Sequence, residues 1–515
     1  MFSLRKMINF NSNIELKLKE IFRLCELNIF SEEKLTKLCT KYTEFENNDK
    51  FKFLKLISSQ YSTSAPIVLE NAQKYINTYK ISTNKNNLEL LNSQESLYNS
   101  LTPQYVHLFK NIAKLKTGVK HLVDMRADLI EFTTDKNPEK QDLECMNNLL
   151  KELLQIWFSI GLLDVERITW QSSCDMLQKI SQYEAVHPVK NWTDLRKRVG
   201  PFRRCFAFTH KSMPGEPIVV LHTALTNTIC NNIQEIVFQP KFRSLQTDNL
   251  SQKLEASNEI NAAIFYSITS TQKGLQNVEL GNHLIKKVVK NLQNEFPNMH
   301  KFSSLSPIPG FRKWFVKLMG KKLNSNKELN DSNSLLDKVF TPTVIAEINP
   351  KLPNYQEIND ENPGLPILKK DDGPSNSNIS DLELDTNNNF WRRMIRVLGE
   401  DITNKWVTDI GLQQLKISLE APLVKLCLHY IYDIKYADGY ATNPVANFHF
   451  RNGANFWRIN WMADTSPRGL EYSFGIMINY RYYLNEVEEN SIKYITEKFI
   501  SISESLKSSL HSFPK

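Results

Sequence analysis

The chain has 515 residues, of which 41% are hydrophobic, and a formal net charge of +8. Because a domain usually has about 100–200 residues, a chain of this length is expected to hold two or more. No apolar run approaches the roughly 18 residues of a membrane-spanning helix, so we expect a soluble protein without a membrane partner. Basic residues are scattered among acidic ones, which argues against nucleic-acid binding. The mild net basicity suits an anionic ligand, but a solvated surface with a small lysine excess explains it more simply.

The seven cysteines are widely spaced, odd in number and without a CxxC pair. This pattern favours a reducing compartment over a disulfide-stabilised secreted protein. There is no HExxH motif, and Cys205 with His210 is an isolated pair without further ligands. We therefore predict no metal site.

Residues 1 to about 158 are predicted to be helical from the spacing of their apolar residues. Ser31 is placed as an N-cap, and apolar residues follow at helical spacing between residues 35 and 42. Further helices are predicted from Thr102 onward and across residues 149–157. Nothing catalytic is predicted in this half.

From residue 159 the pattern mixes strands and helices. Residues 217–225 are rich in β-branched side chains and predict a strand. In residues 457–461, apolar residues alternate with Arg458 and Asn460, which predicts a strand whose polar face lines a site. Residues 321–389 hold many Asn and Lys residues and then six prolines between 342 and 374, so we expect a low-complexity insertion there.

The stretch from 261 to 310 organises the second half. An apolar run at residues 261–269 predicts a buried strand, and a polar turn at residues 276–282 is followed by a helix with one apolar face across residues 284–296. A strand, a turn and a helix in this order direct the free N–H groups of the first helical turn beyond the strand. An anion is the expected ligand of these N–H groups, and an ordinary helix cap is the alternative that the segment alone leaves open.

This turn is the predicted binding segment for that anion. Its residues are Gln276, Asn277, Val278, Glu279, Leu280, Gly281 and Asn282. Gly281 alone lacks a side chain, whereas Asn277 stands where we would expect a smaller glycine. We therefore expect the backbone at Asn277 to approach a phosphate less closely.

The strand, turn and helix resemble the acyl-CoA-binding turn of the GNAT acetyltransferase fold. Together with FSSLSPIPGF (residues 302–311), NPVANFH (443–449) and WRINWMAD (457–464), the GLQNVELG segment (274–281) resembles the malonyl-CoA decarboxylase family. Upstream segments match the same family in the same order: YEAVHPVKNW (183–192), RVGPFRRC (198–205), PGEPIVVLH (214–222) and, in the helical half, GVKHLVDMRADL (118–129).

The resemblance implies an α+β protein with two domains. Residues 1–158 would form an N-terminal all-α helical bundle for oligomerisation, and residues 159–515 a GNAT-like mixed α/β catalytic domain carrying the insertion. It also implies conversion of malonyl-CoA to acetyl-CoA and carbon dioxide without an added cofactor, in a homo-oligomer that is a tetramer by family resemblance.

The chain ends point to a mitochondrial or cytoplasmic location. Four basic residues, Arg5, Lys6, Lys17 and Lys19, with Glu15 as the first acid, resemble a mitochondrial presequence. The last residues, 512–515, differ from the Ser-Lys-Leu peroxisomal signal. We expect the mitochondrial matrix or the cytoplasm.

Decarboxylation of a malonyl thioester leaves an enolate, so the site needs a stabiliser of negative charge and a proton donor. His449 is the candidate donor, because imidazole titrates near neutral pH. Ser306, which is followed by Pro307 and Pro309, would hydrogen-bond the substrate carboxylate or the forming enolate. Ser267 and Glu279 match positions that line the family's active site, and Glu279 is expected to fix the tautomer of His449.

Each assignment has an alternative. Without the NPVANFH match, His449 would sooner be a structural histidine packed beside Phe448 and Phe450, and the match reverses that preference. Glu279 is equally well explained as an acid that favours a helix N-terminus. A nucleophilic Ser306 is disfavoured because no GxSxG elbow surrounds it. For the whole protein, the rivals are an acetyltransferase and a non-enzymatic acyl-CoA sensor, and catalysed release of carbon dioxide separates both from a decarboxylase.

Overall fold

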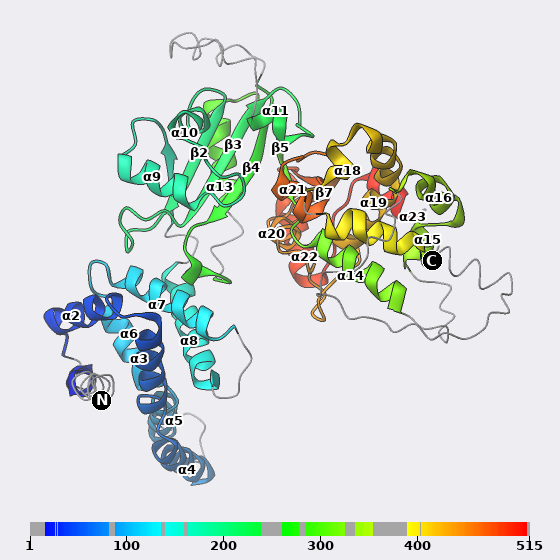
Figure 1. Ribbon diagram of the computed structural model, residues 1–515. Coiled ribbons are helices and arrows are strands. Elements are labelled where there is room, and N and C mark those ends of the chain that lie inside the picture. Colours follow the sequence, from blue (N-terminus) through cyan, green and yellow to red (C-terminus); the bar gives the residue numbers. More distant parts are fainter. Residues whose placement is uncertain are drawn as a thin grey trace, which may run out of the picture. The chain divides into compact units, whose positions relative to one another are not determined.

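The computed structural model describes residues 16–25, 27, 29–81, 88–134, 140–158, 163–237, 260–278, 284–324, 335–353, 389–401 and 403–511 (Figure 1). Two compact units make up the chain. Unit 1 holds Met1–Val199, Cys205–Leu221 and Ile268–Leu284, and unit 2 holds Gly200–Arg204, His222–Ser267 and Ile285–Lys515.

The first half of the described chain is helical, as its apolar spacing predicts. Its helices are α2 (Glu32–Thr43), α3 (Asn47–Gln60), α4 (Ala65–Ile81), α5 (Leu88–Ser100), α6 (Gln104–Ile112), α7 (Gly118–Phe132) and α8 (Gln141–Trp157). Their core includes the fully buried Leu54, Leu108, Leu122 and Leu150. Ser31 has the extended conformation of an N-cap, but its side chain accepts no capping hydrogen bond.

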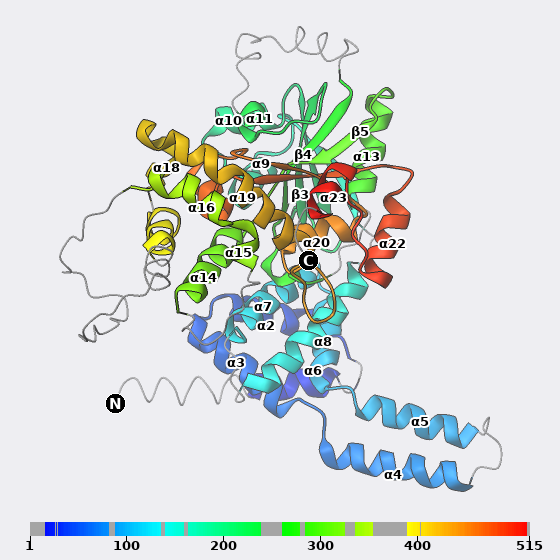
Figure 2. The ribbon, with the colours of Figure 1, turned by 90° about the vertical axis from the view of Figure 1, so that its right-hand side faces the viewer.

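Helices α4 and α5 lie side by side as a hairpin that extends away from α3, α6 and α8 (Figures 1 and 2). No residue of α4 is buried. Large apolar side chains are therefore exposed along the hairpin, among them Ile76, Tyr79 and Leu91. Exposed apolar residues clustered on one element indicate a surface that binds another protein.

A mixed sheet follows the helices, which confirms the predicted α+β fold class. Its strands are β1 (Asp164–Ile168), β2 (Arg203–Thr209), β3 (Val219–Thr226), β4 (Ala262–Ser270), β5 (Lys301–Ser304), β6 (Ser306–Pro307), β7 (Asn455–Asn460) and β8 (Met477–Tyr482). The strand order is β1-β2-β3-β4-β5-β8-β6, with β7 also paired to β8. Strands β4 and β5 are parallel, whereas β8 is antiparallel to β5, β6 and β7.

Helix α13 (Leu284–Glu295) links the parallel strands β4 and β5, as a parallel pair requires. The side chains expected on its apolar face are buried: Leu284, Ile285, Val288, Val289 and Leu292. The predicted strand and helix within residues 261–296 are thus confirmed as β4 and α13, whereas residues 279–282 of the predicted turn lie outside the described residues.

The other helices fall into two groups by unit. Unit 1 adds α9 (Cys174–Tyr183), α10 (Trp192–Arg198) and the 3-10 turn η4 (Lys273–Leu275). Unit 2 has α11 (Ile233–Val237), α14 (Phe311–Asn324), α15 (Leu335–Val339), α16 (Pro342–Ile348), α18 (Lys405–Thr408), α19 (Gln413–Tyr432), α20 (Pro444–Arg451), α21 (Pro467–Ser473), α22 (Val487–Glu497) and α23 (Glu504–His511).

Part of the predicted low-complexity insertion at 321–389 belongs to the core of unit 2, so the prediction does not hold for residues 335–353. Leu336, Phe340 and Ile348 are at most 1% exposed. The ring of Phe340 stacks on Phe315 at 6.1 Å and meets Trp391 edge-on at 5.1 Å. A few apolar residues in an Asn-rich stretch are enough to anchor two short helices. Residues 325–334 and 354–388 lie outside the described residues.

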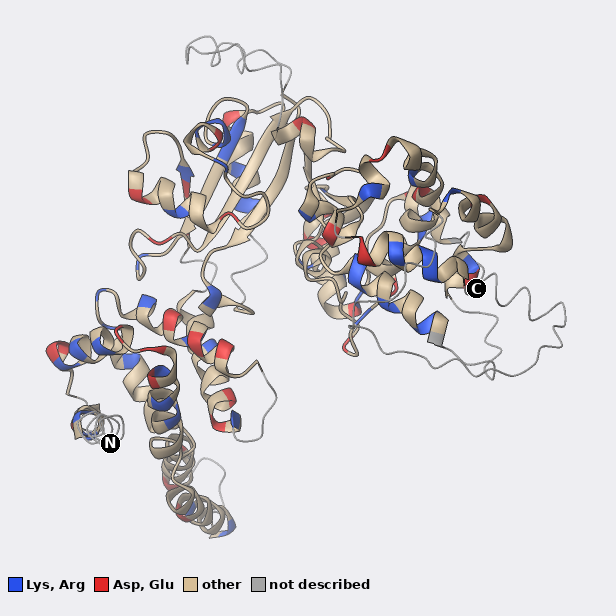
Figure 3. Ribbon diagram, viewed as in Figure 1, with Lys and Arg blue, Asp and Glu red and all other residues tan. Residues whose placement is uncertain are grey.

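Charges are mixed along the helices rather than gathered by sign. Figure 3 shows Lys and Arg interspersed with Asp and Glu on α2, α3 and α8. Within the described ranges, no helix is both long and apolar enough to cross a bilayer.

Candidate active site

Ser306 lies on a short strand rather than in the expected loop. It pairs with Ile478 of β8, and the next residue, Pro307, pairs with Met477. Ser304 ends the neighbouring strand β5. Strand β8 thus pairs with the segments of both Ser304 and Ser306. The side chain of Ser306 is buried, with 6% exposure.

His449 is carried by α20, whose start is fixed by a side-chain cap. The Oδ1 atom of Asn443 accepts from the N–H groups of Val445 at 3.1 Å and Ala446 at 3.0 Å. Its Nδ2 donates to the carbonyl of Pro309 at 3.0 Å. An Asn before a Pro is a typical helix start, and here the cap also ties the helix to the segment that follows Ser306.

The two predicted catalytic residues meet in the folded chain. The Oγ of Ser306 lies 2.8 Å from Nε2 of His449. On the other side of the ring, Nδ1 of His449 lies 2.6 Å from the hydroxyl of Tyr482. Tyr480 stacks on the imidazole at 4.4 Å with an interplanar angle of 18°. The ring is held at both nitrogens and on one face, which a merely apolar packing against Phe448 would not require.

Ser304 extends this network by one residue. The hydroxyl of Ser306 lies 2.9 Å from Oγ of Ser304, which also accepts from the N–H of Tyr480 at 3.4 Å. Side chains alternate along a strand, so the register places Ser304, Ser306, Tyr480 and Tyr482 on one face of the sheet.

Burial keeps the imidazole uncharged. The side chain of His449 is 2% exposed, and the loss of hydration lowers its pKa to about 3. The prediction that the pKa of His449 lies near neutral pH is therefore wrong for the protein without substrate. The pKa of Tyr482 is raised well above 10 by the same burial, so its hydroxyl keeps its proton.

These protonation states favour one direction of hydrogen bonding. The protonated hydroxyl of Tyr482 donates to Nδ1 of His449, which leaves the single imidazole proton on Nε2. That N–H donates to Ser306, whose own proton is then directed to Ser304 or to a ligand. In the structure without a ligand, the chain of donors therefore runs from Tyr482 through His449 and Ser306 to Ser304.

A second polar network supports the serines from the opposite face of β8. The Nδ2 of Asn479 donates to the carbonyl of Ser304 at 2.8 Å. Its Oδ1 accepts from Arg458 Nε at 3.0 Å and from Asn460 Nδ2 at 2.9 Å. The predicted polar face of residues 457–461 therefore binds Asn479, and it positions the strand rather than lining the site.

Ser267 lies on β4, close to the level at which the parallel strand β5 ends at Ser304. It is two residues beyond Phe265, which is in register with Ser304 on the parallel strand β5. Ser267 is 2% exposed, and the ring of Phe265 meets Tyr482 edge-on at 6.1 Å. Strand β4 continues to Ser270, beyond the level at which β5 ends at Ser304.

The predicted anion-binding turn belongs to unit 1, and only its first three residues are described. Gln276 and Asn277 are exposed and Val278 is buried. Glu279, Leu280, Gly281 and Asn282 lie outside the described residues. The role expected for Glu279 in fixing the tautomer of His449 stays a prediction. In the structure, Tyr482 and Ser306 are the partners at the two ring nitrogens of His449.

Comparison with known proteins identifies the family of this site. Residues 161–515 match the malonyl-CoA decarboxylase C-terminal domain, and residues 69–158 match the malonyl-CoA decarboxylase N-terminal domain. The chain belongs to the malonyl-CoA decarboxylase family. It is 45% identical to "Malonyl-CoA decarboxylase, mitochondrial" of Rattus norvegicus over 427 residues, which cover 82% of this chain and 74% of the relative.

One further relative and two solved structures are also malonyl-CoA decarboxylases by name. The mitochondrial malonyl-CoA decarboxylase of Anser anser anser is 43% identical over 424 residues, or 82% of this chain and 73% of the relative. The crystal structure of malonyl-CoA decarboxylase from Agrobacterium vitis matches with a TM-score of 0.68 at 25% identity, covering 95% of this chain and 99% of that chain. The structure from Rhodopseudomonas palustris, with a TM-score of 0.69 at 24% identity, covers the same shares and supports the fold.

Sequence reasoning missed several residues of this family member's site. Tyr482, Tyr480 and Ser304 contact the predicted pair, and Asn479 supports it from behind. The alternating aromatic residues of β8 indicate a strand, but no local pattern says which residue faces His449. Asn443 had the clearest signal, since Asn-Pro is a helix-start signature.

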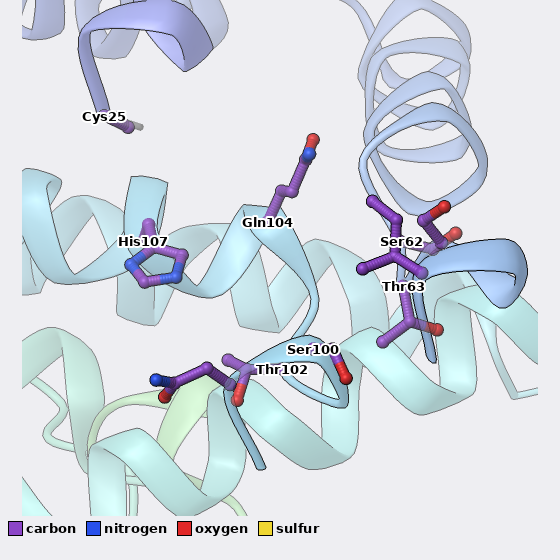
Figure 4. A pocket seen from close by; sticks show the side chains of 10 residues that line it. Cys25, Ser62, Thr63, Ser100, Thr102, Gln104 and His107 are labelled. Atoms are coloured by element: carbon purple, nitrogen blue, oxygen red, sulfur yellow. The ribbon is translucent and has the colours of Figure 1, made fainter. Parts of the chain in front are cut away.

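The family's helical region also contains a hollow of about 300 Å³ in unit 1. Figure 4 shows Ser, Thr, Gln and His side chains around it, with His107 and Gln104 on the same helix. None of the predicted site residues lines it. In the described part of the chain, no group of three or more His, Cys, Asp or Glu side chains is arranged to hold a metal ion.

Proposed function

We propose that this chain is a malonyl-CoA decarboxylase, a carboxy-lyase that converts malonyl-CoA to acetyl-CoA and carbon dioxide. The observation that carries the proposal is the contact of 2.8 Å between Ser306 and His449 in a chain of this family. Decarboxylation needs a charge stabiliser beside a proton donor, and this pair supplies both.

The reaction breaks the bond between the α-carbon and the carboxylate. Its electron pair moves onto the thioester carbonyl and forms an enolate, and carbon dioxide leaves. The hydroxyl of Ser306, oriented by His449, donates a hydrogen bond to the substrate carboxylate and then to the enolate oxygen. A fixed donor in a buried site stabilises that charge more than water does, because the site need not reorganise.

The proton for the α-carbon comes from His449. The imidazole is neutral in the empty site, where burial lowers its pKa to about 3. A substrate carboxylate beside the ring raises that pKa, since an opposite charge favours the protonated form. Substrate entry thus lets the ring take up the proton that it later gives to the α-carbon, which restores the neutral state.

The test is an assay of the purified chain with malonyl-CoA that follows acetyl-CoA and carbon dioxide. His449→Ala should lower turnover by at least about 100-fold, because general acid catalysis contributes about 10²–10⁴-fold. Binding of malonyl-CoA should persist. Turnover of His449→Ala within about tenfold of the wild type would show that His449 is not the proton donor.

Coenzyme A would be held by main-chain amides of the turn at residues 276–282. Main-chain donors depend on conformation, so Gly281→Val should raise the KM for malonyl-CoA more than Lys286→Ala or Lys287→Ala does. Binding mainly through lysine would reverse that order and make KM strongly salt-dependent, because exposed charges are screened over about 8–10 Å. Measuring the three variants at two salt concentrations decides between these modes.

We also propose a homo-oligomer in the mitochondrion. The exposed apolar side chains of the α4 and α5 hairpin support self-association. The mitochondrial location is supported by the names of the relatives from Rattus norvegicus and Mus musculus. Cell fractionation with a matrix marker tests the location, and detection of the chain only in the cytosol would overturn it.

A further inference from the structure

Arg126 is a buried cation on α7 whose partners are main-chain carbonyls. It is 2% exposed, and its Nη1 donates to the carbonyl of Gly274 and, at 2.9 Å, to that of Gln276. All of these residues belong to unit 1. Burying a guanidinium costs free energy. The buried position of Arg126 therefore points to a role beyond packing for the segment at residues 274–276 that it binds.

That segment is a type II turn. The N–H of Val278 donates to the carbonyl of Leu275 at 3.0 Å. The first central residue, Gln276, has φ −58° and ψ 132°, and the second, Asn277, has φ 60°. These angles define type II, which prefers Gly at its second central position. Asn is tolerated there, but it favours the turn less than Gly does.

Types I and II differ by a flip of the central peptide, which joins Gln276 to Asn277. Arg126 binds the carbonyl of that peptide and so selects the type II orientation. In a planar trans peptide the N–H points opposite to the carbonyl. The N–H of Asn277 therefore points away from α7, on a turn whose two central residues are exposed.

The turn is seated closely on α7. A Cβ atom at Gly274 would lie 1.8 Å from the carbonyl oxygen of Val123, so only glycine permits this contact. At the edge of the contact, Lys273 pairs with Glu131 at 2.8 Å. The position of the turn relative to Arg126 is thus set by backbone packing rather than by flexible side chains.

We propose that Arg126 is a positioning residue for the coenzyme A diphosphate, acting by fixing the turn so that the N–H of Asn277 is presented to the phosphate. This inference rests on the proposed function and deepens it. It gives the helical half a part in substrate affinity, where the sequence predicted nothing catalytic. Arg126 itself does not touch the ligand.

The test compares two substrates in the full chain. Arg126→Met keeps the apolar stem and removes the two hydrogen bonds. Its KM for malonyl-CoA should rise at least about tenfold, the effect of losing an oriented donor to a charged group. Its kcat/KM for malonyl-pantetheine, which lacks the diphosphate, should stay within about twofold, because this substrate has no diphosphate to bind the turn that Arg126 fixes.

Rescue separates orientation from general stability. Asn277→Gly added to Arg126→Met should recover much of the lost affinity, because Gly favours the type II turn by itself. Lys273→Gln is the matched control, since it removes an exposed ion pair at the same contact and should leave KM within about twofold. A Kd for coenzyme A alone, from calorimetry, should follow the same order.

If Arg126→Met lowers kcat/KM equally for both substrates, or if Asn277→Gly gives no rescue, the inference is wrong. Should Arg126→Met not fold, Asn277→Gly and Asn277→Val in the wild-type background replace it. The Val variant should weaken coenzyme A binding and the Gly variant should strengthen it, because Gly favours the type II turn, and equal effects would overturn the proposal. Failure of the proposed function is separate, because it appears as wild-type chain that releases no carbon dioxide.

Discussion

At the scale of single residues, the hydrogen bonds of His449 decide what the imidazole can do. Burial lowers its pKa to about 3, so the ring is neutral without substrate. The hydroxyl of Tyr482 at Nδ1 then places the ring proton on Nε2, toward Ser306. The tautomer is thus set by a tyrosine that keeps its proton, rather than by the carboxylate that often orients a catalytic histidine.

Tyr482→Phe should therefore impair catalysis with little effect on substrate binding. The variant removes the hydroxyl 2.6 Å from Nδ1 of His449 and keeps the ring that contacts Phe265. We expect kcat to fall at least about tenfold with KM nearly unchanged, because a mis-set proton donor loses part of the about 10²–10⁴-fold of general acid catalysis.

A matched control is Tyr494→Phe. This hydroxyl is also buried, and it bonds Asn447 at 2.8 Å and the N–H of Ala441 at 2.9 Å without contacting His449. It should lower the melting temperature but leave kcat within about twofold. Equal losses of kcat in both variants would indicate a general packing effect.

The lowered pKa of His449 also predicts a pH dependence of stability. In the unfolded chain His449 binds a proton below about pH 6.5, whereas in the folded chain it does so only below about 3. Its contribution is full above pH 6.5 and is lost as the pH falls toward 3. Relative to His449→Gln, wild-type unfolding free energy should fall by up to about 1.4 kcal/mol per pH unit in this window.

The measurement is urea unfolding of both proteins between about pH 7 and 4.5, where linear extrapolation gives the free energy of unfolding. Other carboxylates titrate in both proteins, so only the difference between the two curves carries the signal. A difference that stays constant with pH would mean that the imidazole is hydrated in the folded chain.

At the scale of elements, short segments hold the site because each is tied to a neighbour. Helix α20 starts at an Asn443 cap that also bonds Pro309, and β6 consists of two residues paired to β8. Helices α15 and α16 are similar, since they are short and depend on the aromatic core around Phe340. Segments of this length are not stable alone and need tertiary packing.

Phe340→Ala should consequently destabilise unit 2. The side chain is 1% exposed and packs against Phe315 and Trp391. Removing a buried Phe typically costs about 3–5 kcal/mol, so we expect a lower melting temperature and less soluble protein.

Replacing residues 354–388 with a short Gly-Ser linker should leave a cooperative melt and activity, because loop length changes closure entropy slowly.

The two changes test where the insertion ends. A linker variant without a cooperative melt would show that residues 354–388 also contribute to the core. A Phe340→Ala variant as stable as the wild type would show that α15 and α16 are peripheral. Thermal melts followed by circular dichroism distinguish these outcomes.

At the scale of the whole molecule, the α4 and α5 hairpin carries large apolar side chains that the described part of the chain leaves exposed. Ile76, Tyr79 and Leu91 are between 48% and 55% exposed, and no residue of α4 is buried. Since exposed apolar clusters mark interaction surfaces, the proposed self-association is assigned to this hairpin.

Ile76→Lys combined with Leu91→Lys should reduce the subunit number in light scattering, because burying two charges at an apolar interface is unfavourable. Ile492→Lys is the control, as Ile492 is 55% exposed on α22 of the other unit. An unchanged subunit number in the hairpin variant would place the interface elsewhere. Truncation before residue 159 is a poorer test, since it also removes Val123 and Arg126 from the turn at Gly274.

Much of this protein follows from local sequence patterns. Apolar spacing predicts the helices of the first half and the strand and helix across residues 261–296, because side-chain periodicity is a property of each segment alone. The two prolines that follow Ser306 and the Asn-Pro start before His449 single out these two segments. Family resemblance then pairs these two residues, which are separated by 143 positions.

Only the tertiary structure decides what surrounds them. The register of β8 brings Tyr482 to His449 and Ser304 to Ser306, and strand register depends on pairing between segments far apart in the chain. The pKa of His449 follows from burial by many elements together, and Arg126 reaches the turn at Gln276 across 150 residues. None of these contacts has a local pattern, because each is set by where the chain packs rather than by which residues are neighbours in sequence.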